Sequence, residues 1–197
     1  TTPLNRSGRM FVTAPISKRS WSLAGIAEPG HTDFLARETG CEAVMMMVGG
    51  RLRVTFVTMH VPLARALGAL QSSAILRSID VTDRSLRGLF GFPRPRIGVA
   101  GVNPHAGETG LFGDEEEKII APAVEAAREK GVQVEGPVPP DAVFRLGAQG
   151  RYDAVVAMYH DQGHIPIKTH DFAHSVTVTL GLPIVRTSVD HGTAFDI

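Results

Sequence analysis

The sequence has few cysteines and no excess of one charge, and each of these absences excludes a class of site or partner. Its 197 residues include one cysteine, Cys41, so an internal disulfide and a cysteine-based zinc site are excluded. An excess of one charge is also missing, because 20 basic and 20 acidic residues cancel. No overall field would therefore attract nucleic acid or an anionic membrane. We expect no nucleic-acid partner, and any bound anion must be held by local groups.

Long apolar runs and export signals are absent as well. No stretch approaches the roughly 18 apolar residues that span a bilayer, and the N-terminus has no charged-then-apolar leader. The sequence therefore predicts a cytoplasmic protein without membrane contact. Because it opens at Thr1 without a methionine and stops at "TAFDI" without a closing helix, we also expect a part of a longer protein.

Three common active-site motifs are missing too. The glycine-rich segment "GVNPHAGETGLFG" (101–113) has neither the G-x-G-x-x-G order of a dinucleotide fingerprint nor the lysine of a P-loop. Ser17 and Ser20 lack the G-x-S-x-G setting of a serine hydrolase. The glycines at 101–113 indicate only a tight strand-to-helix turn with accessible backbone.

What is present is a regular alternation of short apolar runs with helix-like stretches. This alternation is typical of βαβ units and predicts an α/β fold with three layers, α/β/α. A hairpin across Gly49-Gly50 predicts that the mostly parallel sheet is mixed. The expected strands are 10–14, 43–48, 53–58, 97–102, 133–135, 154–158, 176–179 and 184–187. The expected helices are 32–39, 63–79 with a possible break before 81–90, 114–130 and 141–147.

The acidic run at the start of helix 114–130 needs no function. Glu115, Glu116 and Glu117 favour the N-terminal end of a helix because its dipole attracts negative charge.

Three of the eight histidines follow predicted strands: His60, His105 and His160. The carboxyl ends of parallel strands share one edge of a sheet, where ligands bind. Two interpretations stay open. Each histidine is a loop residue with a single hydrogen bond, or the three imidazoles meet and hold a divalent metal with one open position. Asp161 either orients a ligand histidine or lies in an exposed turn.

The groups that would hold an anion are also ambiguous. His31 and Thr32 stand at the start of a predicted helix, where they cap the helix or help its free N–H groups to bind an anion. Lys168 and Arg186 are lone cations near apolar runs. An interior arginine needs a partner, either structural or a bound carboxylate or phosphate.

Several segments together resemble the 4-hydroxythreonine-4-phosphate dehydrogenase family of vitamin B6 synthesis. They run from about Phe11 to Ile197 and are "VTAPISK", "PGHTDFLA", "VTMHVPL", "GVNPHAGETGLFGDEE", "GPVPPD", "YDAVVAMYHDQGHIPIK" and "TLGLPIVRTSVDHGTAFDI". The resemblance implies an NAD- or NADP-dependent oxidation of 4-phosphooxy-L-threonine, a small phosphorylated hydroxy acid, followed by decarboxylation to 3-amino-2-oxopropyl phosphate. It also implies a homodimer, with one divalent metal (Zn, Mg or Co) in a site shared between subunits.

The resemblance assigns roles to particular residues. It implies metal ligation and catalysis by His60, His105 and His160, with Lys168 as a further catalytic residue. Substrate contacts are implied for His31, Thr32, Lys168, Thr177 and Arg186, and contacts to the adenosine side of the cofactor for His191, Gly192, Thr193 and Ala194. It further implies two subdomains with the active site in the cleft between them: a central, dimer-forming part at 15–95 and a cofactor- and substrate-binding part at 96–197.

The sequence departs from the family pattern in two respects. Thr177 stands where the biosynthetic enzymes usually carry asparagine, so the substrate can instead be D-threonate or D-erythronate 4-phosphate, which lack the amino group. An N-terminal part and a closing segment of the family pattern are also absent, which leaves an incomplete dehydrogenase. An alternative from another class is a non-catalytic relative that binds phosphate or metal.

Overall fold

The computed structural model describes residues 10–28 and 30–189. These residues form a sheet of eight strands in the order β1-β8-β7-β2-β3-β6-β4-β5. The pairs β1–β8, β3–β6, β4–β6 and β4–β5 are parallel, whereas β2–β3, β2–β7 and β7–β8 are antiparallel. The expected mixed, mostly parallel sheet is therefore confirmed. Its strands are β1 Met10–Thr13, β2 Val44–Gly49, β3 Leu52–Phe56, β4 Arg96–Ala100, β5 Gln133–Val138, β6 Ala154–Ala157, β7 Val176–Leu180 and β8 Val185–Val189.

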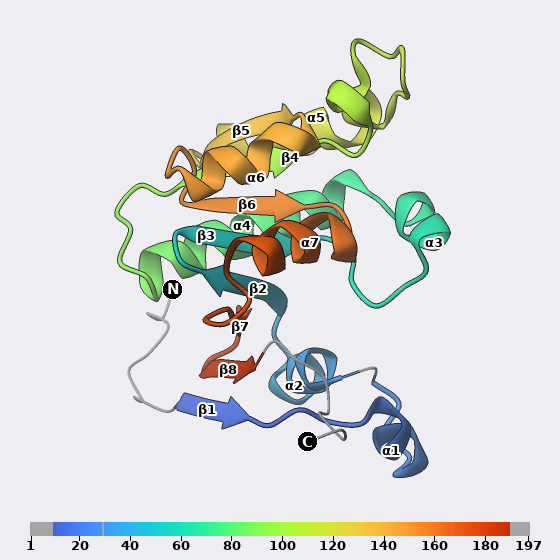
Figure 1. Cartoon of the computed structure of the whole chain (residues 1–197), viewed down its shortest axis with the longest axis vertical. Helices are drawn as coiled ribbons and strands as arrows, with labels where there is room; N and C mark the ends of the chain where they lie inside the picture. The colour runs from blue at the N-terminus through green and yellow to red at the C-terminus, as the bar shows by residue number, and fades with distance from the viewer. Residues whose placement is uncertain (1–9, 29, 190–197) are drawn as a thin grey trace.

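Helices cover both faces of this sheet. Figure 1 shows α6 and α7 on one face and α4 and α5 on the other, which confirms the three-layer arrangement. A π-helical turn, η2, leads directly into α5, and a short 3-10 turn, η1, follows β4. The bounds are α1 Lys18–Leu23, α2 His31–Thr39, α3 Leu63–Gly68, α4 Ser72–Gly88, η1 Pro104–Gly107, η2 Glu116–Ile120, α5 Ala121–Glu129, α6 Pro140–Ala148 and α7 His160–Asp171.

The apolar core is split by the sheet into two clusters, and β6 contributes to both. Ala154 and Val156 pack in the cluster with α4 and α5, while Val155 and Ala157 pack in the cluster with α6 and α7. Side chains alternate between the two faces of a strand, so a central strand with both faces covered reads as a continuous apolar run. This explains why "AVVA" contains no polar residue.

The predicted hairpin is confirmed, but the predicted helix break is not where we expected it. Gly49 pairs with Leu52, and Gly50 has a left-handed φ of 54° at the turn. The helical stretch is interrupted at 69–71 instead of before 81, because Leu70 turns into the core between α3 and α4. Helix α4 continues through Asp80, which lies at the surface in an ion pair with Lys130.

The two parts expected along the sequence contribute strands to one shared sheet. Strand β3 of the first part pairs with β6 of the second, and β2 pairs with β7. The division at residue 95 stays a prediction. Within residues 10–28 and 30–189, no helix has the length and apolar character to cross a bilayer.

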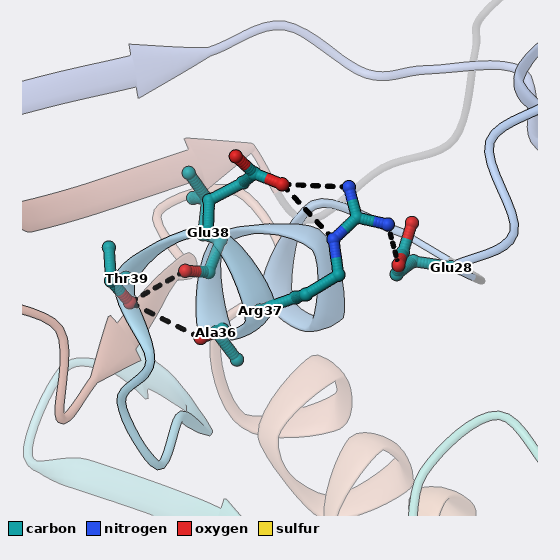
Figure 2. Close-up of polar contacts among 6 residues, drawn as sticks. Glu28, Ala36, Arg37, Glu38 and Thr39 are labelled. Atoms are coloured by element: carbon teal, nitrogen blue, oxygen red, sulfur yellow. Dashed lines mark hydrogen bonds and ion pairs between the residues drawn. The ribbon is translucent and has the colours of Figure 1, made fainter.

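A surface cluster ties α2 to the segment that precedes it. Figure 2 shows the Arg37 guanidinium between the carboxylates of Glu28 and Glu38. The Thr39 hydroxyl donates to the Leu35 carbonyl at 2.6 Å in the last turn. Exposed pairs of this kind contribute at most about 1 kcal/mol. Their effect here is to tether the chain that enters α2 at Gly30.

Candidate functional site

The three predicted histidines all follow neighbouring parallel strands. His60 comes after β3, His160 opens α7 after β6, and His105 lies in η1 after β4. Because β3, β6 and β4 are adjacent and parallel, their carboxyl ends form one edge of the sheet. The sheet topology therefore places the three connecting segments along the same edge.

A cavity of about 570 Å³ opens at this edge. Seven of the residues predicted to act in the site line it: His31, Thr32, His60, His160, Lys168, Thr177 and Arg186. A larger and more apolar groove, of about 760 Å³ between α6 and α7, contains none of them. The positions predicted to contact the adenosine side of the cofactor, 191–194, lie outside the described residues.

His60, His160 and His164 gather on one wall of the cavity. The ring centroids of His60 and His160 are 5.7 Å apart, and His164 stacks on His160 at 3.6 Å with an interplanar angle of 9°. His164 was not predicted as a site residue, although its spacing of four from His160 would place both on one face of a helix. The Asp161 carboxylate lies 2.6 Å from Nδ1 of His160. The carboxylate can therefore accept a hydrogen bond from Nδ1–H, which leaves the Nε2 lone pair of His160 available.

His105 does not join this group within one chain. It is exposed in η1, its ring lies 6.2 Å from that of Phe112, and it does not line the cavity. Across the described parts of the chain, no three histidine, cysteine or carboxylate side chains are grouped so that they could hold a metal ion. The rings of His160 and His164 are stacked in parallel, so their in-plane lone pairs cannot point to one ion. The two side chains therefore cannot both bind the same metal. A metal site with three histidines would need His105 from a second copy of the chain.

Helix α2 begins at the cavity without a side-chain cap. Its N-cap residue is Gly30, and neither His31 nor Thr32 makes a capping hydrogen bond. The capping interpretation is therefore wrong. The first N–H groups of a helix lack intrahelical acceptors and favour anions, and both side chains line the cavity beside them.

Arg186 is the most deeply buried cation of the site, with 5% of its surface exposed. Its guanidinium donates to the Thr13 hydroxyl at 2.6 and 3.1 Å and to the Thr179 hydroxyl at 3.2 Å. Among the residues that the structure describes, no carboxylate forms an ion pair with it. Burial lowers the pKa of Arg186. Burial also lowers the pKa of His31, and the charge of Arg186 lowers it further, so the positive charge of Arg186 acts on this part of the cavity.

The fold and this cavity define a class of protein. A mixed α/β sheet carries, at the carboxyl edge of its parallel strands, a pocket that combines imidazoles, a buried guanidinium and a free helix N-terminus. Such a pocket suits a small anionic metabolite.

Comparison with known proteins agrees with that class. Residues 4–197 match the family model described as pyridoxal phosphate biosynthetic protein PdxA, and the chain belongs to this family. The 4-hydroxythreonine-4-phosphate dehydrogenase of Desulforapulum autotrophicum is 55% identical over 95% of the chain. The D-threonate 4-phosphate dehydrogenase of Pectobacterium atrosepticum is 50% identical over the same share.

A solved structure gives the same result. The crystal structure of 4-hydroxythreonine-4-phosphate dehydrogenase from Klebsiella pneumoniae matches 96% of this chain at 55% identity with a TM-score of 0.88. The chain spans little more than half of these proteins: 55% and 57% of the two relatives and 57% of the solved chain.

Proposed function

We propose that the protein containing this chain is a metal-dependent dehydrogenase that oxidises 4-hydroxythreonine 4-phosphate with NAD or NADP. The product loses carbon dioxide to give 3-amino-2-oxopropyl phosphate, a step of vitamin B6 synthesis. The single observation that carries the proposal is the cavity that gathers seven predicted residues from α2, α7, β7, β8 and the segment after β3.

The substrate anion would bind at the positive end of this cavity. Arg186 keeps donors that its two threonine partners do not use, since a guanidinium has five N–H groups and three hydrogen bonds are formed. The start of α2 offers backbone N–H groups beside His31 and Thr32. Phosphate and carboxylate groups both match these donors. Lys168 lines the same cavity and would balance the second anionic group.

His60 and His160 fit two ligands of one divalent ion. Two imidazoles on a tetrahedral ion have ring centroids about 5 Å apart, close to the 5.7 Å found here. Desolvation lowers the pKa of His60, and the charges of Lys18 and His160 act in the same direction. His60 is therefore kept in the neutral form that binds metal. Bound there, an ion would act as a Lewis acid on the substrate oxygen while the nicotinamide accepts the hydride.

The third ligand would come from a second copy of the chain. His105 is exposed and does not line the cavity, so a homodimer can supply the partner's His105 without rearranging the fold. Exposed apolar side chains flank both loops, which supports an interface at this place. They are Val61, Leu63 and Leu67 after His60, and Leu111 and Phe112 after His105.

A second substrate is supported by Thr177. Its side chain is buried in β7 and lines the cavity, where a threonine offers one hydroxyl in place of an amide. Relatives named D-threonate 4-phosphate dehydrogenase are 50% identical to the chain. D-Threonate or D-erythronate 4-phosphate is therefore the alternative substrate, in sugar acid catabolism.

The test is the reduction of NAD⁺ and NADP⁺ by the purified natural protein, with each phosphorylated acid in turn, before and after removal of divalent ions. We expect turnover that a chelator abolishes and that Zn²⁺, Mg²⁺ or Co²⁺ restores. The preferred acid, by kcat/KM, decides between the two dehydrogenases. Binding of both acids without nicotinamide reduction would favour the non-catalytic relative, and turnover unaffected by chelation would overturn the metal assignment.

A further inference from the structure

Glu116 is buried although it belongs to an acidic run at the start of a helix. It is 3% exposed, whereas Glu117 beside it is exposed. A buried carboxylate is costly unless it is hydrogen-bonded. The hydrogen-bond partners of Glu116 therefore show which segment the carboxylate stabilises.

The partners of Glu116 all belong to the loop that follows β4. Oε1 accepts the backbone N–H groups of Val102 and Asn103, each at 2.7 Å. Oε2 accepts the Asn103 side-chain amide at 2.9 Å, and that amide also donates to Glu115 at 2.6 Å. Charge-assisted bonds of this kind are stronger than neutral ones. They fix the backbone two residues before His105.

The loop needs such support because its backbone is in an unfavourable conformation. His105 and Ala106 have φ values of 53° and 54°, and Glu108 and Thr109 have 40° and 56°. Residues other than glycine persist in the left-handed region only when the surroundings hold them there. His105 is exposed and does not line the cavity of its own chain, so the direction of its side chain depends on this backbone.

Glycines on both sides of His105 make room for the carboxylate. A Cβ at Gly101 would lie 3.0 Å from Oε1 of Glu116, and one at Gly107 would lie 2.9 Å from Oε2. Glu116 also opens the π-helical turn η2, a feature that frequently marks functional sites. The carboxylate is thus enclosed by the loop.

We propose that Glu116 is a positioning residue that holds loop 101–107 so that His105 is presented to the metal site of a partner subunit. This rests on the proposed function, in which His105 is the ligand donated across the dimer. Glu116 does not line the cavity, so it would contact neither substrate nor metal there. Burial alone would raise its pKa, but the hydrogen bonds from Asn103 and Val102 outweigh burial and hold the pKa below its usual value, so the carboxylate stays ionised near neutral pH.

The test compares Glu116→Gln with the matched surface variant Glu117→Gln in the natural protein. The measurements are Zn²⁺ affinity by competition with a chelator and amide hydrogen exchange across 101–107. We expect Glu116→Gln to speed exchange at Val102 and Asn103 and to weaken Zn²⁺ binding about 10- to 100-fold, as loss of a ligand's support does in known metal sites. Glu117→Gln should match the parent in both measurements.

A rescue variant separates positioning from a general loss of structure. Adding Asn103→Asp and Glu115→Gln to Glu116→Gln reverses the donors and acceptors of the cluster, so Zn²⁺ affinity should return to within a few-fold of the parent. Parental affinity in Glu116→Gln, or no recovery in a folded rescue variant, would overturn the inference and leave the dehydrogenase proposal intact. If Glu116→Gln does not fold, Asn103→Ala takes its place, and unchanged affinity there would also overturn it. If the parent does not bind Zn²⁺, the same comparison is made with Co²⁺ and Mg²⁺, and a parent that binds none of the three would reject the metal assignment on which this inference rests.

Discussion

At the residue scale, His31 shows how burial and a neighbouring cation govern a titration. Its pKa is lowered by burial and by the charge of Arg186. The pKa in the folded chain lies below the unfolded value of 6.5. Folding stability that is present above pH 6.5 is therefore lost as the pH falls from 6.5 toward the folded pKa. A bound anion reverses the balance by favouring the protonated imidazole.

This predicts that anion binding takes up a proton. Sulfate, which keeps its double charge, should bind the natural protein more tightly at about pH 6 than at about pH 8. Calorimetric titration at both values checks this, and His31→Asn should reduce the difference. Arg186→Met should weaken sulfate binding at both pH values, because the remaining donors carry less charge. A sulfate affinity that does not change with pH would contradict the coupling between anion binding and protonation of His31. The same pH dependence in His31→Asn would contradict it as well.

At the element scale, the sequence pattern did not reveal two helices, the short α1 and the longer α7 beside the cavity. Gly163 and Pro166 lie inside α7, and both residues disfavour helix interiors. Gly163 is there because the helix packs directly on the sheet. A Cβ at this position would lie 2.5 Å from the Phe56 ring and 2.7 Å from Val54. Packing thus overrides intrinsic preference, and it places His160 and His164 against the cavity.

We predict that Gly163→Ala destabilises the protein, even though alanine favours helices. The helix would gain about 1 kcal/mol from propensity, but overpacking a core costs about 1–3 kcal/mol. We expect a net loss of about 1 kcal/mol in urea unfolding, together with weaker sulfate and Zn²⁺ binding as α7 shifts. The control is Gly68→Ala at the end of α3, where a Cβ would meet nothing within 4 Å. Equal unfolding midpoints for the two variants would contradict this account of α7.

At the scale of the whole molecule, the proposed dimer would decide whether the proposed metal site is complete. His60 and His160 lie together in one chain, whereas His105 lies outside their cavity. If the site is shared between subunits, two inactive variants can complement each other in a mixed dimer. If the site lies within one chain, they cannot.

Mixing His60→Ala with His105→Ala should restore activity. Each variant alone has no complete site, but a mixed dimer contains one, in which the intact His60 faces the intact partner's loop. With random exchange, half of the dimers are mixed and each has one site of two, so about a quarter of parental turnover should return. Dehydrogenase assays after joint unfolding and refolding measure this. No recovery, with mixed dimers demonstrated by mass spectrometry, would exclude sharing.

Much of the fold could be predicted from the sequence because the period of apolar residues is a local property. All eight expected strands are present within a few residues of their predicted bounds, and the hairpin at Gly49-Gly50 follows from turn chemistry. The break between α3 and α4 could not be predicted, since it depends on Leu70 finding a place in the core. Their places after strands also predicted His60 and His160 as site residues, whereas Thr177 was predicted only from the family resemblance; all three line the cavity.

The sequence by itself determined the eight strands, the helices other than α1 and α7, and the polar residues that follow the strands, because these depend on neighbours along the chain. Only the tertiary structure decided which of those residues meet. It brought His60 beside His160, left His105 exposed, and buried Glu116 out of an acidic run that looks like a solvated surface. The physical reason is that convergence and burial depend on packing between segments far apart in the chain, and no local pattern encodes that packing.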